Sequence, residues 1–301
     1  MSRLAPFFVI FAAILWAVDG IVLRPELFSL PVTLVVFIES VIVAILLTPI
    51  LIKNFGVIKS LHYKDWLAFA GVALLGGAVG TMAITKALFY VNYVNLSIVI
   101  LIQKLQPVFA LILAGIFLKE KLSKQFFVWT IVAMIGAYFM TFGIKLPVLQ
   151  SGDKTLLAAL YALLAAASFG SSTVLSKRAL RNVGFELGTY LRFAISAVIM
   201  LLIISGSGTI QNLPDVISRQ IMIFLLIAFT TGGTAIFLYY YGLKQITASV
   251  ATICELAFPL AAVTLEYFIR GNILSPVQWV GTTVLFFSIL RITKMPEERV
   301  K

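Results

Sequence analysis

The chain has 301 residues, of which 61% are hydrophobic and only 12% are charged, and its mean hydropathy is +1.07. A soluble domain typically carries about 25% charged residues, so this composition excludes a soluble globular protein. A formal charge of +11 is also found in nucleic-acid-binding proteins, but here most Lys and Arg residues fall in short loops between apolar runs. The sequence therefore predicts an all-α integral membrane protein in contact with the lipid bilayer, with no nucleic-acid partner.

Apolar runs recur along the whole chain, and each is about as long as the roughly 20 residues that cross a bilayer as a helix. Polar segments or segments rich in Pro and Gly separate them. The expected membrane helices are residues 4–23, 30–52, 66–90, 95–118, 126–143, 155–176, 187–204, 219–242, 247–269 and 275–292. This pattern predicts ten transmembrane helices.

The two halves of the chain are similar in the order of their residues. An alignment that places Pro107 over Pro259 also places Gln103 over Glu255. At nearly the same offset the pairs are Trp16 with Phe169, Arg24 with Lys177, Glu39 with Arg192, and Ser123 with Ser275. Transporters are often built from two related bundles. We therefore expect a first five-helix repeat at 1–145, a second at 153–294 and a tail at 295–301.

The distribution of positive charge predicts the orientation of these repeats. When the N-terminus is placed inside, most of the 23 Lys and Arg residues fall in cytoplasmic segments. The positive-inside rule then places both termini in the cytoplasm. Since five helices per half is an odd number, the two repeats must be inverted with respect to each other. We expect a multi-pass protein of the cell's inner (plasma) membrane.

Several segments carry a resemblance to a known family. They are "AAILWAVDG" (12–20), "SFGSST" (168–173), "YLRFAIS" (190–196), and "LQPVFALILAGIFLKEKLS" (105–123) with its counterpart "AFPLAAVTLEYFIRGNILS" (257–275). In these segments the chain resembles the EamA-type ten-helix carriers of the drug/metabolite transporter superfamily, over residues 4–292. The resemblance implies a transporter without a cofactor. Glu39 departs from it, because the family more often has Arg there, whereas Arg192 keeps the usual residue.

The ionisable side chains within the expected spans that carry the argument are Asp19, Glu39, Lys86, Lys104, Arg192 and Glu255. A charge at mid-bilayer costs about 2.5 to 3.5 kcal/mol, so each must face protein or a wet cavity. We expect Lys86 to pair with Asp19 or Glu39 in the outer half of the first repeat. Lys104 and Glu255 fall near the middles of the fourth and ninth helices, where inverted-repeat transporters hold substrate. Purely structural ion pairing is the alternative.

The candidate substrate-binding residues are Trp16, Glu39, Lys86, Gln103, Lys104, Phe169, Arg192, Tyr239 and Glu255. Glu39 and Glu255 are also candidates for proton coupling, because apolar surroundings favour the neutral form of a carboxyl group. Pro107 and Pro259 each remove a backbone donor, so they are candidate hinges or plain kinks. The aromatic residues could surround a cation, or could simply pack.

These features favour a secondary active transporter or exchanger that moves a small polar, amino-acid-like metabolite by alternating access. A carrier for organic or quaternary ammonium cations is the alternative within transport. An integral-membrane enzyme is the alternative from another class, but no phosphate-binding loop is present, and the lone His62 has no Cys or carboxylate at metal-ligand spacing. We therefore expect neither catalytic residues nor a metal site.

The fifth and tenth helices, almost free of charge, should pack at the periphery and could support a homodimer.

Overall fold

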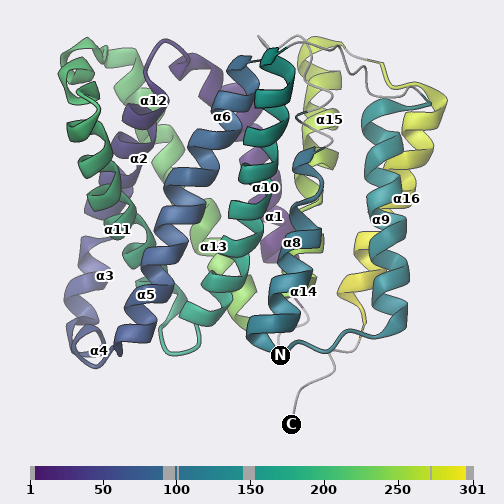
Figure 1. Cartoon of the computed structure of the whole chain (residues 1–301), viewed down its shortest axis with the longest axis horizontal. Coiled ribbons are helices and arrows are strands. Elements are labelled where there is room, and N and C mark those ends of the chain that lie inside the picture. The colour runs from purple at the N-terminus through teal and green to yellow at the C-terminus, as the bar shows by residue number, and fades with distance from the viewer. Residues whose placement is uncertain (1–3, 91–98, 100–101, 145–152, 272, 296–301) are drawn as a thin grey trace.

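The computed structural model describes residues 4–90, 99, 102–144, 153–271 and 273–295, and within these ranges every regular element is a helix. Seven helical stretches are long and apolar enough to cross a membrane, judged by length and composition. They are Ala5–Leu27, Tyr63–Ala87, Lys124–Phe142, Leu156–Ala179, Phe185–Gly206, Ser218–Gln245 and Ala248–Ile269. Two further apolar helices are shorter, Val32–Leu46 and Gln106–Leu118. The helices stand side by side as a bundle (Figure 1).

In the first half of the chain the α-helices are α1 (Ala5–Val18), α2 (Val32–Leu46), α3 (Thr48–Lys53), α4 (Phe55–Lys59), α5 (Tyr63–Val72), α6 (Gly80–Tyr90), α8 (Gln106–Leu113) and α9 (Lys124–Phe142). π-helical turns at Asp19–Leu23, Ala73–Val79 and Ala114–Leu118 extend or join them, and Arg24–Leu27 is a 3₁₀ turn. The start of the helix expected at 95–118 and most of the expected linker between the repeats lie outside the described residues.

In the second half the α-helices are α10 (Asp153–Ala179), α11 (Phe185–Gly206), α12 (Ser218–Phe229), α13 (Gly233–Gln245), α14 (Ala248–Cys254), α15 (Ala257–Arg270) and α16 (Pro276–Thr293). The span expected at 219–242 is present as the stretch Ser218–Gln245, which leaves regular helical geometry at Thr230–Gly232, between α12 and α13. A Cβ atom on Gly232 would lie 2.7 Å from Glu39 Oε1. A larger residue at this position would require the end of the Glu39 side chain to shift.

Both halves interrupt a helix at the same place in the alignment. The backbone turns at Lys104–Leu105 before α8 begins, and again at Glu255–Leu256 before α15 begins. Pro107 and Pro259 therefore lie in the first turn of a new helix, where the missing N–H of proline costs no helical hydrogen bond. Each proline thus accompanies a local interruption of regular helix, while Leu105, Glu255 and Leu256 keep right-handed helical backbone angles.

The loops that follow these helices also correspond. Lys119 and Gly271 both end their helix in the left-handed region, with φ of 56° and 68°. Ser123 and Ser275 then cap α9 and α16, and each hydroxyl accepts a hydrogen bond from a backbone N–H three residues later. Ser is favoured at this position because its oxygen satisfies a donor that the helix leaves free. The same local structure therefore occurs once in each half.

A further contact occurs once at each end of the bundle. The amide of Asn182 donates to Asp65 Oδ1 at 3.0 Å, and the amide of Gln220 donates to Ser29 Oγ at 2.8 Å. Asp65 and Gln220 both lie in a first helical turn, and their side chains accept from the backbone N–H that precedes α5 or α12. α5 begins at the lower end of the bundle and α12 at the upper end (Figure 1). The two related contacts therefore lie at opposite ends.

α9 and α16 form a pair at one edge of the bundle (Figure 1). Glycines bring the two backbones together, since a Cβ atom on Gly136 would lie 2.8 Å from the backbone nitrogen of Leu285. Large apolar side chains such as Phe127 on α9 and Val280 on α16 are exposed. An apolar exposed surface is what a bilayer requires of a peripheral helix pair.

Candidate functional site

Glu255 forms the centre of a polar cluster inside the bundle. Its Oε2 accepts a hydrogen bond from Gln106 Nε2 at 2.6 Å. Its Oε1 accepts from Tyr239 Oη at 2.7 Å and from Thr173 Oγ1 at 3.1 Å. These donors come from α8, α13 and α10, so the carboxylate connects helices from both halves of the chain.

The Glu255 cluster continues along the first helix break. Gln103 Nε2 donates to Gln106 Oε1 at 3.3 Å, which joins two amides and the carboxylate in one chain of hydrogen bonds. Gln103 Oε1 is buried and has no partner among the described residues. On the other side of the cluster the rings of Trp16 and Tyr239 lie 5.3 Å apart between centroids. The cluster thus combines amides, a carboxylate and aromatic rings.

Arg192 on α11 interacts electrostatically with both Glu39 and Glu255. Its guanidinium lies 5.9 Å from the ring centroid of Tyr240, and its Nη1 donates to the Tyr240 hydroxyl at 3.5 Å. That hydroxyl also shares a hydrogen bond with Ser176 Oγ at 3.0 Å. Within the described part of the chain Arg192 makes no ion pair, so its charge remains available to a carboxylate or a ligand.

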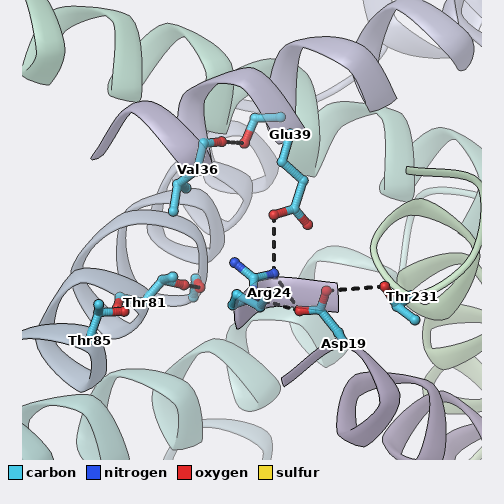
Figure 2. Close-up of polar contacts among 9 residues, drawn as sticks. Asp19, Arg24, Val36, Glu39, Thr81, Thr85 and Thr231 are labelled. Carbon is cyan, nitrogen blue, oxygen red and sulfur yellow. Dashed lines mark hydrogen bonds and ion pairs between the residues drawn. The ribbon is translucent and has the colours of Figure 1, made fainter. Parts of the chain in front are cut away.

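A second cluster surrounds Arg24, where α1 gives way to a π-helical turn (Figure 2). Arg24 Nη2 lies 2.5 Å from Asp19 Oδ2 and 3.3 Å from Glu39 Oε2. Thr231, at the break between α12 and α13, donates to Asp19 Oδ1 at 3.2 Å. Two carboxylates share one guanidinium, and the acidic side chains are only 9% and 14% exposed. We call Asp19, Arg24, Glu39 and Thr231 the Arg24 cluster.

Polar contacts also join the ends of the helices on the lower side of Figure 1. The carboxylate of Glu120 accepts from the backbone N–H groups of Ala248 at 2.8 Å and Ser249 at 3.0 Å. It thereby satisfies donors that the start of α14 leaves free. Lys177 Nζ donates to the carbonyl oxygen of Leu243 at 2.8 Å, near the end of α13. The loop that carries Glu120 is thus tied to the start of α14, and the end of α10 is tied to the end of α13.

The model of the EamA-like transporter family matches residues 3–142 and 156–294. The chain belongs to the EamA-like transporter family. It is therefore a membrane transporter of the drug/metabolite transporter superfamily and not an enzyme, as the resemblance in its motifs implied.

Relatives of this EamA-like transporter carry transport names. The chain is 45% identical over 288 residues to the riboflavin transporter ImpX of Fusobacterium nucleatum, covering 94% of this chain and 95% of that protein. It is 27% identical over 248 residues to the uncharacterized transporter YwfM of Bacillus subtilis, covering 80% and 78%. A solved crystal structure shares the fold, with a TM-score of 0.74, 14% identity, and coverage of 96% of this chain and 97% of that one.

The structure brings several of the predicted site residues together. The Glu255 cluster, which lies at the centre of the bundle and is called the central cluster below, contains four of them: Trp16, Gln103, Tyr239 and Glu255. Glu39 lies instead in the Arg24 cluster. The expected meeting of the fourth and ninth helices is confirmed by the contact of α8 with α14 and by the hydrogen bond that Gln106 donates to Glu255.

Three other predicted residues make no hydrogen bond or ion pair with Glu255 in the part of the chain that the structure describes. Phe169 packs near Gly80, where an added Cβ atom would lie 2.9 Å from its ring. Lys104 is half-buried and makes no hydrogen bond or ion pair with the described residues. The prediction that Lys86 pairs with Asp19 or Glu39 was wrong, because Arg24 forms an ion pair with each of these carboxylates. Lys86 is exposed, and its Nζ lies 5.7 Å from the ring centroid of Tyr161.

Sequence reasoning missed Arg24, Gln106 and Thr173. Arg24 follows directly after the first expected span, 4–23, and the π-helical turn at Asp19–Leu23 brings it back onto the two acids. Gln106 and Thr173 lie in the motif segments, yet nothing in the spacing showed that they contact Glu255. A useful signal would have been that all three are polar groups at the boundary or interior of apolar runs.

Proposed function

We propose that the chain is a carrier for riboflavin. The observation that carries this proposal is the 45% identity, over 94% of the chain, to a protein named as a riboflavin transporter. The central cluster fits a flat aromatic ligand with a polar edge, because Trp16 and Tyr239 offer ring surfaces and Gln103 and Gln106 offer amides. Riboflavin is a polar metabolite, so it falls within the broad class expected from the sequence, but it is larger than an amino acid and carries no net charge.

An amino-acid-like substrate remains the competing candidate. It is supported by the opposite charges of Glu255 and Arg192, which interact with each other and could receive an ammonium and a carboxylate group. A quaternary ammonium cation would rely on Glu255 and the aromatic rings alone. The three candidates differ in the charge that the site must neutralise.

Uptake into proteoliposomes that contain the purified protein tests these candidates. We expect saturable uptake of labelled riboflavin that excess unlabelled riboflavin abolishes and that amino acids or choline leave unchanged. Vesicles without protein give the background. Uptake of riboflavin no greater than this background, together with saturable uptake of an amino acid or choline, would overturn the proposal.

We further propose that the transporter has ten membrane helices in two inverted repeats, 1–145 and 153–294, followed by a tail at 295–301. In this proposal the protein lies in the inner (plasma) membrane of the cell, with both termini in the cytoplasm. The two family matches, the corresponding helix breaks and the related contacts at opposite ends of the bundle support this arrangement. Reporter fusions after residues 181 and 207 test it, since the first should report cytoplasm and the second the outside.

We propose alternating access as the mechanism, with the Arg24 cluster closing the outer side and the Glu120 contact closing the inner side. The two helix breaks, next to Pro107 and Pro259, provide positions about which half-helices can move. Glu39 and Glu255 are the proposed proton-coupling residues. Riboflavin uptake that is indifferent to an imposed pH gradient, in the native protein and in Glu255→Gln alike, would contradict coupling and leave exchange as the mechanism.

A homodimer through the α9–α16 edge is a further proposal, supported by the exposed apolar side chains on that pair. A cysteine introduced at Val280 should form a crosslink between two copies in native membranes, and one introduced at Leu202, which is exposed on α11, should not. Equal crosslinking at both positions would show random collision.

A further inference from the structure

The orientation of the two amides at the first helix break follows from the carboxylate of Glu255. In its ionised state the carboxylate of Glu255 can only accept hydrogen bonds, so in the arrangement of this structure Gln106 offers it Nε2 and directs Oε1 the other way. That oxygen accepts from Gln103 Nε2 at 3.3 Å. Gln103 must in turn direct its own oxygen away from Gln106. The acceptor at Gln103 is therefore fixed by a chain of contacts that begins at Glu255.

This acceptor, Gln103 Oε1, is buried and has no hydrogen-bond partner among the described residues. A buried polar atom without a partner is costly, and such atoms in a folded protein call for an explanation. Gln103 lies at the helix break, one residue before the turn at Lys104–Leu105, and belongs to the central cluster. A donor supplied by the transported ligand would satisfy it.

We propose that Gln103 Oε1 accepts the N3–H of the flavin ring and so selects for the imide edge of the substrate. This inference rests on the proposed function in riboflavin transport. The ring system of riboflavin has a single N–H, at N3, between two carbonyl groups, whereas its opposite edge carries two methyl groups. An acceptor of fixed orientation therefore distinguishes the two edges of the ring.

The position of the aromatic residues agrees with this assignment. Tyr239 donates to Glu255 and its ring lies 5.3 Å from that of Trp16, so the aromatic pair and the two amides are attached to the same carboxylate. A flavin ring that contacts Tyr239 would also lie near the amides, because Tyr239 and Gln106 bond to the same carboxylate. Gln103 Oε1 is enclosed in this conformation, so a ligand reaches it only after the residues around it rearrange.

Transport of two flavins by two variants tests the assignment. The probes are riboflavin and N3-methylriboflavin, which lacks the N–H, and a riboflavin altered at ring position 8 serves as a ligand control because it keeps N3–H. The variants are Gln103→Leu, which removes the acceptor, and Gln245→Leu, which removes a half-buried glutamine whose only hydrogen bond within the described part of the chain goes to the carbonyl oxygen of Tyr241. The ratio of uptake of the two flavins is measured within each protein, so it does not depend on how much protein folds.

We expect the native protein and Gln245→Leu to prefer riboflavin to N3-methylriboflavin by about tenfold or more, since a site built around a hydrogen bond rejects a ligand that lacks it. In Gln103→Leu the preference should fall to within about twofold. The inference is overturned if the native protein transports both flavins equally, or if Gln103→Leu keeps the full preference. If the native protein transports no riboflavin at all, the proposed function fails as well, and the two failures are thereby distinguished.

Discussion

Gln106 and Glu255 connect the helix break of the first half to that of the second, through a hydrogen bond of 2.6 Å. The carboxylate accepts two further hydrogen bonds, so three donors converge on it from three helices. Any change in this group therefore acts on both halves of the chain at once.

Replacement of Glu255 by Gln should lower riboflavin uptake by about tenfold or more. The neutral amide replaces a carboxylate that accepts three hydrogen bonds, and its NH₂ group cannot accept any of them, so the charge-assisted bonds, each contributing about 1.5 to 3 kcal/mol, are lost or weakened. Uptake into proteoliposomes measures the loss. Glu26→Gln is the control, because Glu26 forms an exposed ion pair with Arg219 at 2.6 Å. Equal uptake by both variants would contradict a central role for Glu255.

Replacement of Arg24 by Gln should destabilise the transporter strongly. It leaves Asp19 and Glu39 as two buried carboxyl groups without their shared cation, and breaking a buried ion pair costs about 3 to 5 kcal/mol. The double variant Arg24→Gln/Glu39→Gln should recover part of the lost stability, because one of the two carboxylates is then neutral. Thermal unfolding in detergent measures both. A double variant less stable than Arg24→Gln alone would show that the charge balance of the Arg24 cluster is unimportant.

The all-helical membrane-embedded fold could be predicted from the sequence, because it depends on run length and hydropathy, whereas the inverted repeat stays a prediction from the order of residues such as Pro107 and Pro259. The partners of the polar residues could not be predicted. Arg24 reaches Asp19 only because the turn after α1 is π-helical, and hydropathy does not report such a turn. Likewise Gln106 contacts Glu255 only because the helix restarts there, and that geometry depends on the packing of α8 against α14.

Replacement of Lys104 by Met should stabilise the protein and impair its function. Lys104 is half-buried near the helix break and has no acidic partner among the described residues, so its charge costs folding free energy. Removing it should raise stability by roughly 1 kcal/mol, because a half-buried charge costs less than one at the bilayer centre. Riboflavin uptake should fall, because Lys104 is a predicted substrate-binding residue. Lys86→Met, in an exposed lysine, is the control, and uptake unchanged in both variants would remove Lys104 from the site.

Replacement of Gly281 by Ala should separate α9 from α16. The added Cβ atom would lie 2.8 Å from the carbonyl oxygen of Gly136, and backbone atoms cannot rotate away as a side chain can. Overpacking of this kind costs about 1 to 3 kcal/mol. Gly115→Ala is the matched control, because nothing lies within 4 Å of its added Cβ. The melting temperature should fall only in Gly281→Ala, and riboflavin uptake per folded protein should stay unchanged if this helix pair is peripheral.

Replacement of Glu120 by Gln should increase the reactivity of Cys254. Cys254 is the only cysteine, it is fully buried, and it ends the short helix α14 whose first turn Glu120 holds through two backbone N–H groups. A buried thiol reacts with maleimide only when the structure opens, so a weaker hold on α14 should raise the labelling rate several-fold. Saturating riboflavin should lower the labelling rate of Cys254 again. Glu186→Gln, in the first turn of α11, is the control at the same end of the bundle. Labelling of Glu120→Gln at the native rate, with full labelling after denaturation, would show that this contact does not control access to the residues around Glu255.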